Sequence, residues 1–372
     1  MQQNIPVETA SGALRSRVHE FHSGLKCAVP IRNHPLNRTI SFERLKVRLG
    51  ELGAKSCHAE RFLRSWCRAS SYDNARSAAE NFFPKFFREN IHAIESELDK
   101  LANLKAFHPA EEGVGRLLVE LADGQLAESV LLPKGGLCVS TQIGCAVGCV
   151  FCMSGRDGLK RQLGSMEIIA QVVLARKMRK VSKVVFMGMG EPSHNLENVL
   201  EAIDILGTHG DVGHKNLVFS TVGDYRVFER LPKERVRPAL ALSLHSADEE
   251  RRAGLLPRAP RIPVKELVDL AERYARLTHY PIQYQWTLLE GINDGHEEME
   301  NLIRLLSGKY AVMNFIPYNS AEGLGFNRPS SGRIVQAVRM LKNAGIVAKV
   351  RDSAGQEIDG ACGQLRARAL EV

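Results

Sequence analysis

The chain has 372 residues, of which 44% are hydrophobic and 25% are charged, an ordinary composition for a large globular protein. Its eight cysteines are too few for a disulfide scaffold. No apolar leader opens the chain, and no apolar run reaches the ~20 residues needed to cross a bilayer. We therefore expect a cytoplasmic protein with no membrane segment, in which thiols stay reduced and free to bind metal.

The formal net charge of +8 is concentrated near the N-terminus. Residues 11–70 hold twelve Lys and Arg against four Asp and Glu, whereas residues 71–372 are nearly neutral. A basic segment beside a nearly neutral remainder is typical of proteins that bind nucleic acid. A basic surface that is merely solvated has the same charge pattern, so charge alone leaves both interpretations open.

The first hundred residues divide into two predicted segments. Residues 1–40 are polar, with scattered Gly, Pro and Asn, and predict a poorly ordered leader. Residues 41–106 predict a small, basic helical accessory domain that binds nucleic acid. Its helices are expected from an N-cap at Ser41 to the glycine stop at Leu52-Gly53, and then over residues 58–66, 78–87 and 91–104.

The rest of the chain changes to strand patterns. Residues 107–136 predict a β-hairpin extension, with strands over 115–121 and 126–132 around Asp123-Gly124. From residue 137 to 355, strands alternate with helices, which predicts an α/β fold whose parallel sheet curls into a partial (β/α)6 barrel. The expected strands are 138–141, 183–187, 217–221, 239–244, 282–288 and 312–317, and the expected helices are 165–179, 196–206, 264–276, 295–306 and 333–344. Residues 356–372 form a C-terminal tail.

Cys145, Cys149 and Cys152 follow the first of these strands with the spacing Cys-x3-Cys-x2-Cys. Three thiolates on one short loop can hold three irons of a [4Fe-4S] cluster and leave the fourth iron open for chemistry. This spacing is similar to the signature of radical S-adenosylmethionine (radical-SAM) proteins, in which the open iron binds the amino and carboxylate groups of S-adenosylmethionine. One electron from the cluster then cleaves a carbon–sulfur bond and yields a 5′-deoxyadenosyl radical.

A structural zinc site is the alternative for these cysteines, because Cys138 lies seven residues upstream and would supply a fourth ligand. The usual zinc pattern, two well separated Cys-x2-Cys pairs, does not match this spacing. The loop is also followed by alternating strands and helices rather than by a small ribbon. Both observations favour the cluster.

Small and polar residues stand at the carboxyl ends of several predicted strands, where parallel α/β folds place their functional sites. Gly190 and Glu191, within Gly-Met-Gly-Glu-Pro, combine close backbone approach with a carboxylate that suits a cationic amino group. Each such residue alone is an ordinary loop residue, but their shared register along the barrel rim indicates a cofactor site. The further candidates, for ribose hydroxyls and a carboxylate, are Ser220, Ser243, Leu244, His245 and Asn319.

The C-terminal tail places a single thiol, Cys362, among small residues in Asp-Gly-Ala-Cys-Gly-Gln-Leu. Small neighbours suit a thiol that must be exposed and mobile, although a buried, inert side chain is the default for an isolated cysteine. The remaining cysteines, Cys27, Cys57 and Cys67, have no motif around them and are interpreted as structural.

From about residue 41 to residue 367, the chain resembles the RlmN/Cfr family of radical-SAM RNA adenine methyltransferases. The matching stretches are LCVSTQIGC at 137–145, VFMGMGEP at 185–192, LALSLH at 240–245, GIND at 291–294, NFIPYN at 314–319 and ACGQL at 361–365. The resemblance implies a radical-SAM partial barrel, an rRNA and/or tRNA substrate, and two molecules of S-adenosylmethionine per turnover. It also implies an electron donor such as flavodoxin or ferredoxin.

The resemblance further implies roles for three side chains. Cys362 would be methylated by the first S-adenosylmethionine. The radical from the second would take a hydrogen atom from that methyl group, and the methylene would add to an adenine ring carbon, C2 or alternatively C8. Glu128 would remove the ring proton as general base. Cys138 would then attack the Cys362 sulfur and release the product as a transient disulfide forms.

Two stretches depart from the family pattern. Residues 153–158 read Met-Ser-Gly-Arg-Asp-Gly where a small-residue run ending in Gln-Gly is common, and Gln285-Trp286 stands in place of Glu-Tyr. Both stretches lie near the active face and leave open which RNA is the target and whether C2 or C8 is methylated. Two other functions also stay open, a non-methylating radical-SAM enzyme and an iron–sulfur RNA-binding sensor. A sensor has no use for a methyl-carrying thiol, and the basic helical segment favours RNA over a protein or small-molecule substrate.

Overall fold

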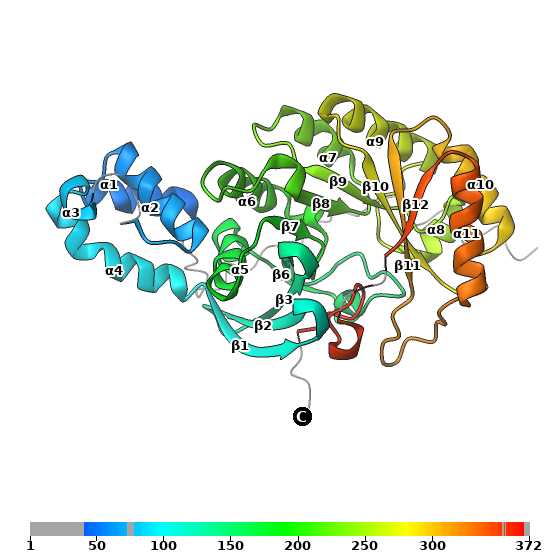
Figure 1. The fold of residues 1–372 in the computed structure, drawn as a ribbon, viewed down its shortest axis with the longest axis horizontal. Helices are drawn as coiled ribbons and strands as arrows, with labels where there is room; N and C mark the ends of the chain where they lie inside the picture. Colours follow the sequence, from blue (N-terminus) through cyan, green and yellow to red (C-terminus); the bar gives the residue numbers. More distant parts are fainter. Residues whose placement is uncertain (1–40, 73–77, 352, 354, 368–372) are drawn as a thin grey trace, which may run out of the picture. The chain divides into compact units, whose positions relative to one another are not determined.

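The computed structural model describes residues 41–72, 78–351, 353 and 355–367 (Figure 1). The described residues all belong to one compact unit. The predicted leader over residues 1–40 and the cysteine at position 27 lie outside the described residues. In the part of the chain that is described, no helix has both the length and the apolar character needed to span a bilayer.

The N-terminal helices are α1 (Phe42–Glu51), α2 (Ser56–Arg68), α3 (Ala79–Phe82) and α4 (Lys85–Asp99). Helix α1 begins as predicted, because the Ser41 hydroxyl accepts a hydrogen bond from the Arg44 N–H at 3.2 Å. It also ends as predicted, with Gly53 at a φ of 80° just beyond it. The predicted break between helices at residues 87–91 is wrong, since α4 starts after Pro84 and runs through that region.

The predicted helix over 91–104 also ends too late. Helix α4 stops at Asp99, and strand β1 (Ala102–Pro109) begins three residues later. Strand β1 pairs antiparallel with β2 (Gly115–Leu121), with an irregularity between Leu104 and Ala106, so residues 102–106 belong to the sheet and not to the helix. The helical segment is therefore shorter than expected, and the hairpin extension gains a third strand.

A ten-stranded sheet organises the described residues, in the order β1-β2-β3-β4-β7-β8-β9-β10-β11-β12. Neighbours from β1 to β4 pair antiparallel, which includes the predicted hairpin, and neighbours from β4 to β12 pair parallel. The sequence analysis did not predict β12. The remaining bounds are β3 (Leu126–Leu132), β4 (Gly136–Cys138), β7 (Lys183–Phe186), β8 (Leu217–Thr221), β9 (Ala239–Ser243), β10 (Ile282–Leu288), β11 (Ala311–Pro317) and β12 (Val347–Val350).

Helices connect the parallel strands, as expected for an α/β fold with N-terminal helices. The five predicted helices are present, and two short helices, α7 and α8, were not predicted because they span only six and seven residues. A separate two-stranded sheet, β5 (Gln142–Gly144) with β6 (Leu159–Gln162), flanks the cysteine loop. The helices are α5 (Ser165–Met178), α6 (Leu196–Thr208), α7 (Tyr225–Arg230), α8 (Glu249–Leu255), α9 (Val264–Thr278), α10 (His296–Leu306) and α11 (Ser331–Asn343).

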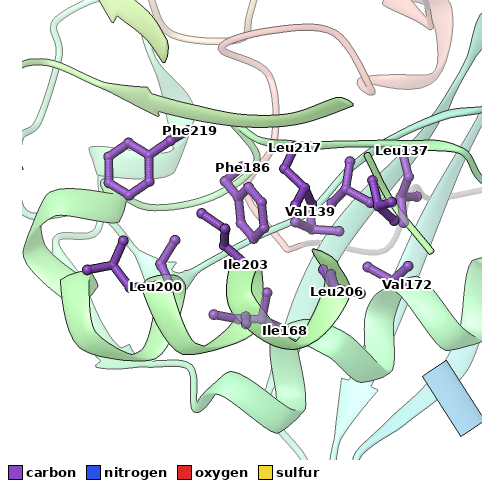
Figure 2. Packing of buried hydrophobic residues seen from close by; sticks show 14 of the residues in the cluster. Leu137, Val139, Ile168, Val172, Phe186, Leu200, Ile203, Leu206, Leu217 and Phe219 are labelled. Atoms are coloured by element: carbon purple, nitrogen blue, oxygen red, sulfur yellow. The ribbon is translucent and has the colours of Figure 1, made fainter. Parts of the chain in front are cut away.

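The core lies between the parallel strands and the helices that cover them. Figure 2 shows Phe186 of β7 and Phe219 of β8 facing Leu200 and Ile203 of α6. Alternate residues of a strand point to opposite faces, so Val185 lies on the other face of β7 from Phe186, in a separate inner cluster. The sheet thus has a helix-covered face and an inner face, and the inner face is where a ligand site can form.

Phe186→Ala is expected to lower the free energy of unfolding by about 3–5 kcal/mol, because it leaves a cavity under a fully buried ring. Chemical denaturation followed by circular dichroism measures this loss. Phe86→Ala is the matched control, since the Phe86 ring is 58% exposed and should change stability by no more than about 0.5 kcal/mol. Equal losses in both variants would contradict this description of the core.

Candidate active site

A cavity of about 370 Å³ lies on the inner face at the carboxyl ends of the parallel strands. Most of the predicted site residues meet there, although they come from distant parts of the chain. Glu128, Leu244 and Asn319 do not line it. The predicted residues that do are Cys138, Cys145, Cys149, Cys152, Gly190, Glu191, Ser220, Ser243, His245 and Cys362.

The small sheet β5–β6 forms the base of the cysteine loop, and the Cys145 N–H donates to the carbonyl of Gly158 at 3.1 Å. Burial raises the pKa of Cys149 well above its ordinary value, and the nearby thiols of Cys152 and Cys145 raise it further. The three thiols therefore share one enclosed space. They could not act on one another in this way if they were splayed into solvent.

This donor set fits a [4Fe-4S] cluster better than a single metal ion. Among the described residues, no three His, Cys, Asp or Glu side chains are grouped closely enough to hold one ion, which removes support from the zinc alternative. In a cubane each thiolate binds a different iron, so the sulfurs need not converge on one point. An apolar cluster that includes Val147, Phe151 and Leu289 surrounds the loop and would shield a cluster from water.

The carboxylate of Glu191 is buried and already has several partners. Its Oε1 accepts from the Ser193 N–H at 3.0 Å and from the Thr221 hydroxyl at 2.6 Å. Its Oε2 accepts from the Val222 N–H at 3.0 Å, and its own N–H donates to Gln142 Oε1 at 2.8 Å. Two carboxylate oxygens offer about four acceptor sites, so this side chain joins neighbouring strand ends and retains acceptor capacity toward the cavity.

His245 is fixed as a neutral hydrogen-bond donor. Its backbone adopts a φ of 60°, and its Nδ1 accepts from the Thr287 N–H at 2.9 Å, which leaves the proton on Nε2. Burial lowers the pKa of His245 to about 3, and the Arg252 guanidinium adds to that shift. The Phe151 ring packs against the imidazole with centroids 4.8 Å apart, so both rings form one wall of the cavity.

Cys362 is half-buried, and the tail around it is anchored rather than free. Burial raises the pKa of Cys138 and of Cys152, and the charge of the nearby Cys362 thiol raises both further. Cys362 therefore lies close to each of these thiols. The anchoring hydrogen bonds run from Met153 N to Gly363 O (2.7 Å), Ser154 Oγ to Leu365 O (2.7 Å), Asn319 Nδ2 to Cys362 O (3.0 Å) and Gln364 Nε2 to Ser320 O (2.8 Å). In this state the expected mobility of the tail is restrained.

The seven cysteines in the described ranges are all free thiols, so the implied disulfide between Cys138 and Cys362 is absent from this state. Cys67 is fully buried in the core, which agrees with a structural side chain. Cys57 is exposed on α2, so its structural interpretation does not hold.

Glu128 lies outside the cavity, buried in an ion pair. Its Oε1 accepts from Arg116 Nη1 at 2.6 Å, with both side chains almost completely shielded from solvent. Its Oε2 accepts from the backbone N–H of Arg366 at 2.8 Å. Burial raises the pKa of Glu128, although the Ala367 N–H and the Arg116 guanidinium act in the opposite direction. The docked tail therefore covers this carboxylate.

Two other predicted cofactor residues, Leu244 and Asn319, make hydrogen bonds to the backbone and to the C-terminal tail. Leu244 is buried in the main core, and its N–H donates to the carbonyl of Gln285 at 3.0 Å. Asn319 donates to Cys362 and to the Ser353 hydroxyl. Its Oδ1 is buried and has no partner within the described residues.

Sequence reasoning missed several residues of the site. Gln142 supports the glycine loop, and the signal for it was its position directly before the cysteine loop. Arg351 and Ser353 line the cavity, but they follow β12, a strand that was not predicted. Of the two departures on β10, Gln285 lines the cavity, whereas Trp286 points into the core and donates to the Asn293 carbonyl at 3.2 Å.

Comparison with known proteins agrees with this geometry. A family profile described as "Radical SAM superfamily" matches residues 139–306. A "Probable RNA methyltransferase" of Azoarcus sp. strain BH72 is 64% identical over 88% of this chain and 94% of its own length. Another, of Pseudomonas aeruginosa strain PAO1, is 63% identical over 88% and 95%. The crystal structure of a radical SAM methyltransferase from Sphaerobacter thermophilus matches with a TM-score of 0.76 and 33% identity, over 88% of this chain and 98% of that one.

The parallel sheet, the three-cysteine loop at its strand ends and these matches define a radical SAM protein. Membership of that superfamily implies S-adenosylmethionine and an iron–sulfur cluster as cofactors. More particularly, the chain belongs to the family of the probable RNA methyltransferases described above.

Gly190→Ala is expected to destabilise the site. Gly190 has a φ of 103°, and an added Cβ would lie 2.6 Å from the Cβ of Gln142. Strain of this kind costs about 1–3 kcal/mol, and it would displace Glu191. Denaturation curves and calorimetric titration with S-adenosylmethionine measure both effects. Gly213→Ala is the control, because the nearest atom to its added Cβ is 3.9 Å away. Equal stability and equal affinity for S-adenosylmethionine in the two variants would contradict the prediction.

Proposed function

We propose that this protein methylates a ring carbon of adenine in rRNA and/or tRNA, with Cys362 as the methyl carrier. C2 is the expected position and C8 the alternative. The observation that carries the proposal is the meeting of Cys362, Cys138 and the three cluster cysteines in one cavity. The relatives named as probable RNA methyltransferases support the substrate class.

A methyl-carrying thiol answers a chemical difficulty. An adenine ring carbon is a poor nucleophile, so direct displacement of the methyl group from S-adenosylmethionine is not available to it. When bound, the cluster and S-adenosylmethionine supply a radical that can take a hydrogen atom from a methyl group. Cys362 holds such a methyl group beside the cluster loop, since its thiol neighbours that of Cys152.

Cys138 is positioned to release the product. Its sulfur would form a bond with the Cys362 sulfur while the bond between that sulfur and the transferred carbon breaks. The electron pair of the broken bond passes to the carbon, which takes up a proton and becomes the methyl group of the product, so the two thiols are oxidised to a disulfide as the carbon is reduced. Burial raises the pKa of Cys138 to about 12, and Arg351 is the cation that opposes the shift. The thiol is therefore protonated near pH 7, and Arg351 stabilises the thiolate as it forms.

Glu128 is proposed as the base that removes the ring proton. In the docked state its Oε2 is occupied by Arg366 N–H, so it becomes available when the tail moves. Its pKa is raised by burial, which makes the carboxylate a stronger base than an exposed glutamate. The pairing with Arg116 keeps the carboxylate oriented during that movement.

The remaining predicted residues are proposed to bind S-adenosylmethionine. Gly190 allows close backbone approach, and Glu191 keeps acceptor capacity for the amino group. His245 Nε2–H can donate to a ribose hydroxyl or the carboxylate, and the hydroxyls of Ser220 and Ser243 line the same cavity. Asn319 is proposed as a further ligand, because its buried Oδ1 has no partner within the described residues.

Replacing Cys138 and replacing Cys362 should block the reaction at different steps. Cys138→Ala should accumulate a covalent protein–RNA adduct, because the methylene bridge forms and no thiol attacks Cys362. Cys362→Ala should form neither adduct nor product. The measurements are denaturing gel electrophoresis of each variant purified with cellular RNA, and nucleoside mass spectrometry after reaction of the reconstituted enzyme.

Cys57→Ala is the control for these variants, since this thiol is exposed on α2 and should leave the rate of methylation unchanged. Iron content confirms that each variant holds its cluster. A Cys138→Ala protein that methylates RNA fully and carries no adduct would reject this division of labour. Mass spectrometry that finds no methylated adenosine with the wild type would reject the proposed function.

The basic helical segment is proposed to recruit RNA through its phosphates. Arg44 and Lys55 are exposed, and replacing both by Gln should weaken RNA binding and flatten its dependence on salt. Each lost phosphate contact lowers the slope of log K against log salt by about 0.7–0.9. Lys265→Gln with Arg276→Gln on α9 removes the same charge elsewhere. Equal slopes of log K against log salt in the two double variants would show that the N-terminal helices do not recruit the RNA.

A further inference from the structure

A second cavity, of about 300 Å³, lies on the inner face of the sheet beside the active-site cavity. The two share Leu132, Pro133, Met187 and Arg351 as wall residues. This second cavity, the cationic cavity, is also lined by Lys183 on β7 and Lys349 on β12. A ligand can therefore extend from one cavity into the other along a common wall.

Strand register sets the distance between the two cavities. Gly136 of β4 pairs with Lys183, and Cys138 pairs with Val185, so Lys183 sits two residues below the register of the reactive thiol. Residues two apart share a face, and each residue advances the strand by about 3.3 Å, or roughly 7 Å for the pair. That step is comparable to the reach from a nucleotide base to a backbone phosphate of the same strand.

The charges of the cationic cavity have one sign. Lys183, Lys349 and Arg351 line it, and no Asp or Glu does. Within the described ranges, the structure pairs none of the three with a carboxylate. Nη1 of the Arg351 guanidinium contacts the Met187 sulfur at 3.8 Å. Partial burial and the Arg351 guanidinium lower the pKa of Lys183, as repulsion between adjacent cations requires.

Lys183 and Lys349 are exposed and Arg351 is half-buried, so solvent screens part of the repulsion between these cations, and a bound anion relieves the rest. The neutral neighbours complete an anion site, since Gln283 of β10 and Asn314 of β11 also line this cavity and carry amide donors. Below them, Val185 and Val218 form an apolar floor. The site therefore suits a small, multiply coordinated anion rather than a flat charged surface.

We propose that the cationic cavity binds a backbone phosphate of the RNA next to the target nucleotide, while the target base occupies the active-site cavity. This inference rests on the proposed function and deepens it. Phosphate contacts fix register and orientation without reading sequence. Lys183, Lys349 and Arg351 thus act as positioning residues that hold the adenine ring against Cys362.

An acidic electron-donor protein is the other partner that cations could attract. The cations here face a recess that is continuous with the reactive thiols, and a folded protein surface does not enter a cavity of about 300 Å³. The carboxylate of S-adenosylmethionine is a third anion, but its proposed ligands lie in the other cavity. The chemistry of the recess therefore favours an extended polyanion that reaches both cavities.

The test uses Lys183→Ala and Lys349→Ala in the full-length, cluster-loaded enzyme. Lys342→Ala is the matched control, because Lys342 is exposed on α11 and lines neither cavity. RNA affinity is measured over a series of salt concentrations, and single-turnover methylation is measured with dithionite as reductant. Each cavity variant should bind RNA about tenfold more weakly, and its salt slope should be lower by about 0.7–0.9. Lys183→Arg should restore the slope.

Iron content and affinity for S-adenosylmethionine show that the variants keep the fold and the cofactor site. Cavity variants that match Lys342→Ala in affinity and slope would overturn this inference while the proposed function stands. Slower turnover with a flavodoxin reductant but not with dithionite, at unchanged RNA affinity, would assign the cations to the electron donor and also overturn it. A wild type that neither binds nor methylates RNA would reject the proposed function and this inference together.

Discussion

The buried carboxylate of Glu128 ties the segment that carries Cys362 to the sheet that carries Cys138. It links the hairpin extension, through Arg116, to the C-terminal tail, through the Arg366 N–H. Breaking a buried ion pair by removing one partner commonly costs 3–5 kcal/mol, so this link is rigid at its base. The tail side of the link consists only of backbone N–H groups, those of Arg366 and Ala367, and these can open without disturbing the ion pair.

The residues that depart from the family pattern also serve the tail. Ser154 donates to the Leu365 carbonyl, and Asp157 pairs with the Arg366 guanidinium at 3.1 Å. The loop that follows Cys152 thus holds the segment that carries Cys362. Both contacts hold the tail, and with it Cys362, beside the cysteine loop.

Most of the fold followed from the sequence, because the parallel strands and their helices have strong apolar periodicity. The failures have physical causes. Strand β1 was read as the end of a helix because its edge position leaves Asn103, Leu104 and Lys105 exposed, so no clear alternation marks it. Strand β12 has only four residues, and two of them are exposed valines. Both strands are defined by their partners rather than by their own composition.

Residues of the site that belong to a sequence motif were predicted well. Residues that reach the site only through tertiary packing were not. The cluster cysteines, Gly190 and His245 met in one cavity as expected. The burial of Glu128 beneath the tail could not be read from the sequence, because Arg366 lies far along the chain. Arg351 was missed together with β12. Side chains that act through tertiary contacts leave no local pattern.

The ten-stranded sheet is open, and its two edges have a consequence for association. An unpaired edge strand offers backbone donors and acceptors to any other strand. Edge strand β1 contains an irregularity between Leu104 and Ala106, carries Lys105 at that point and ends at Pro109. The opposite edge, β12, is short and carries Lys349. Bulges, lysines, proline and short length all discourage edge-to-edge pairing, so the fold protects itself against β-aggregation while its inner face remains open to a ligand.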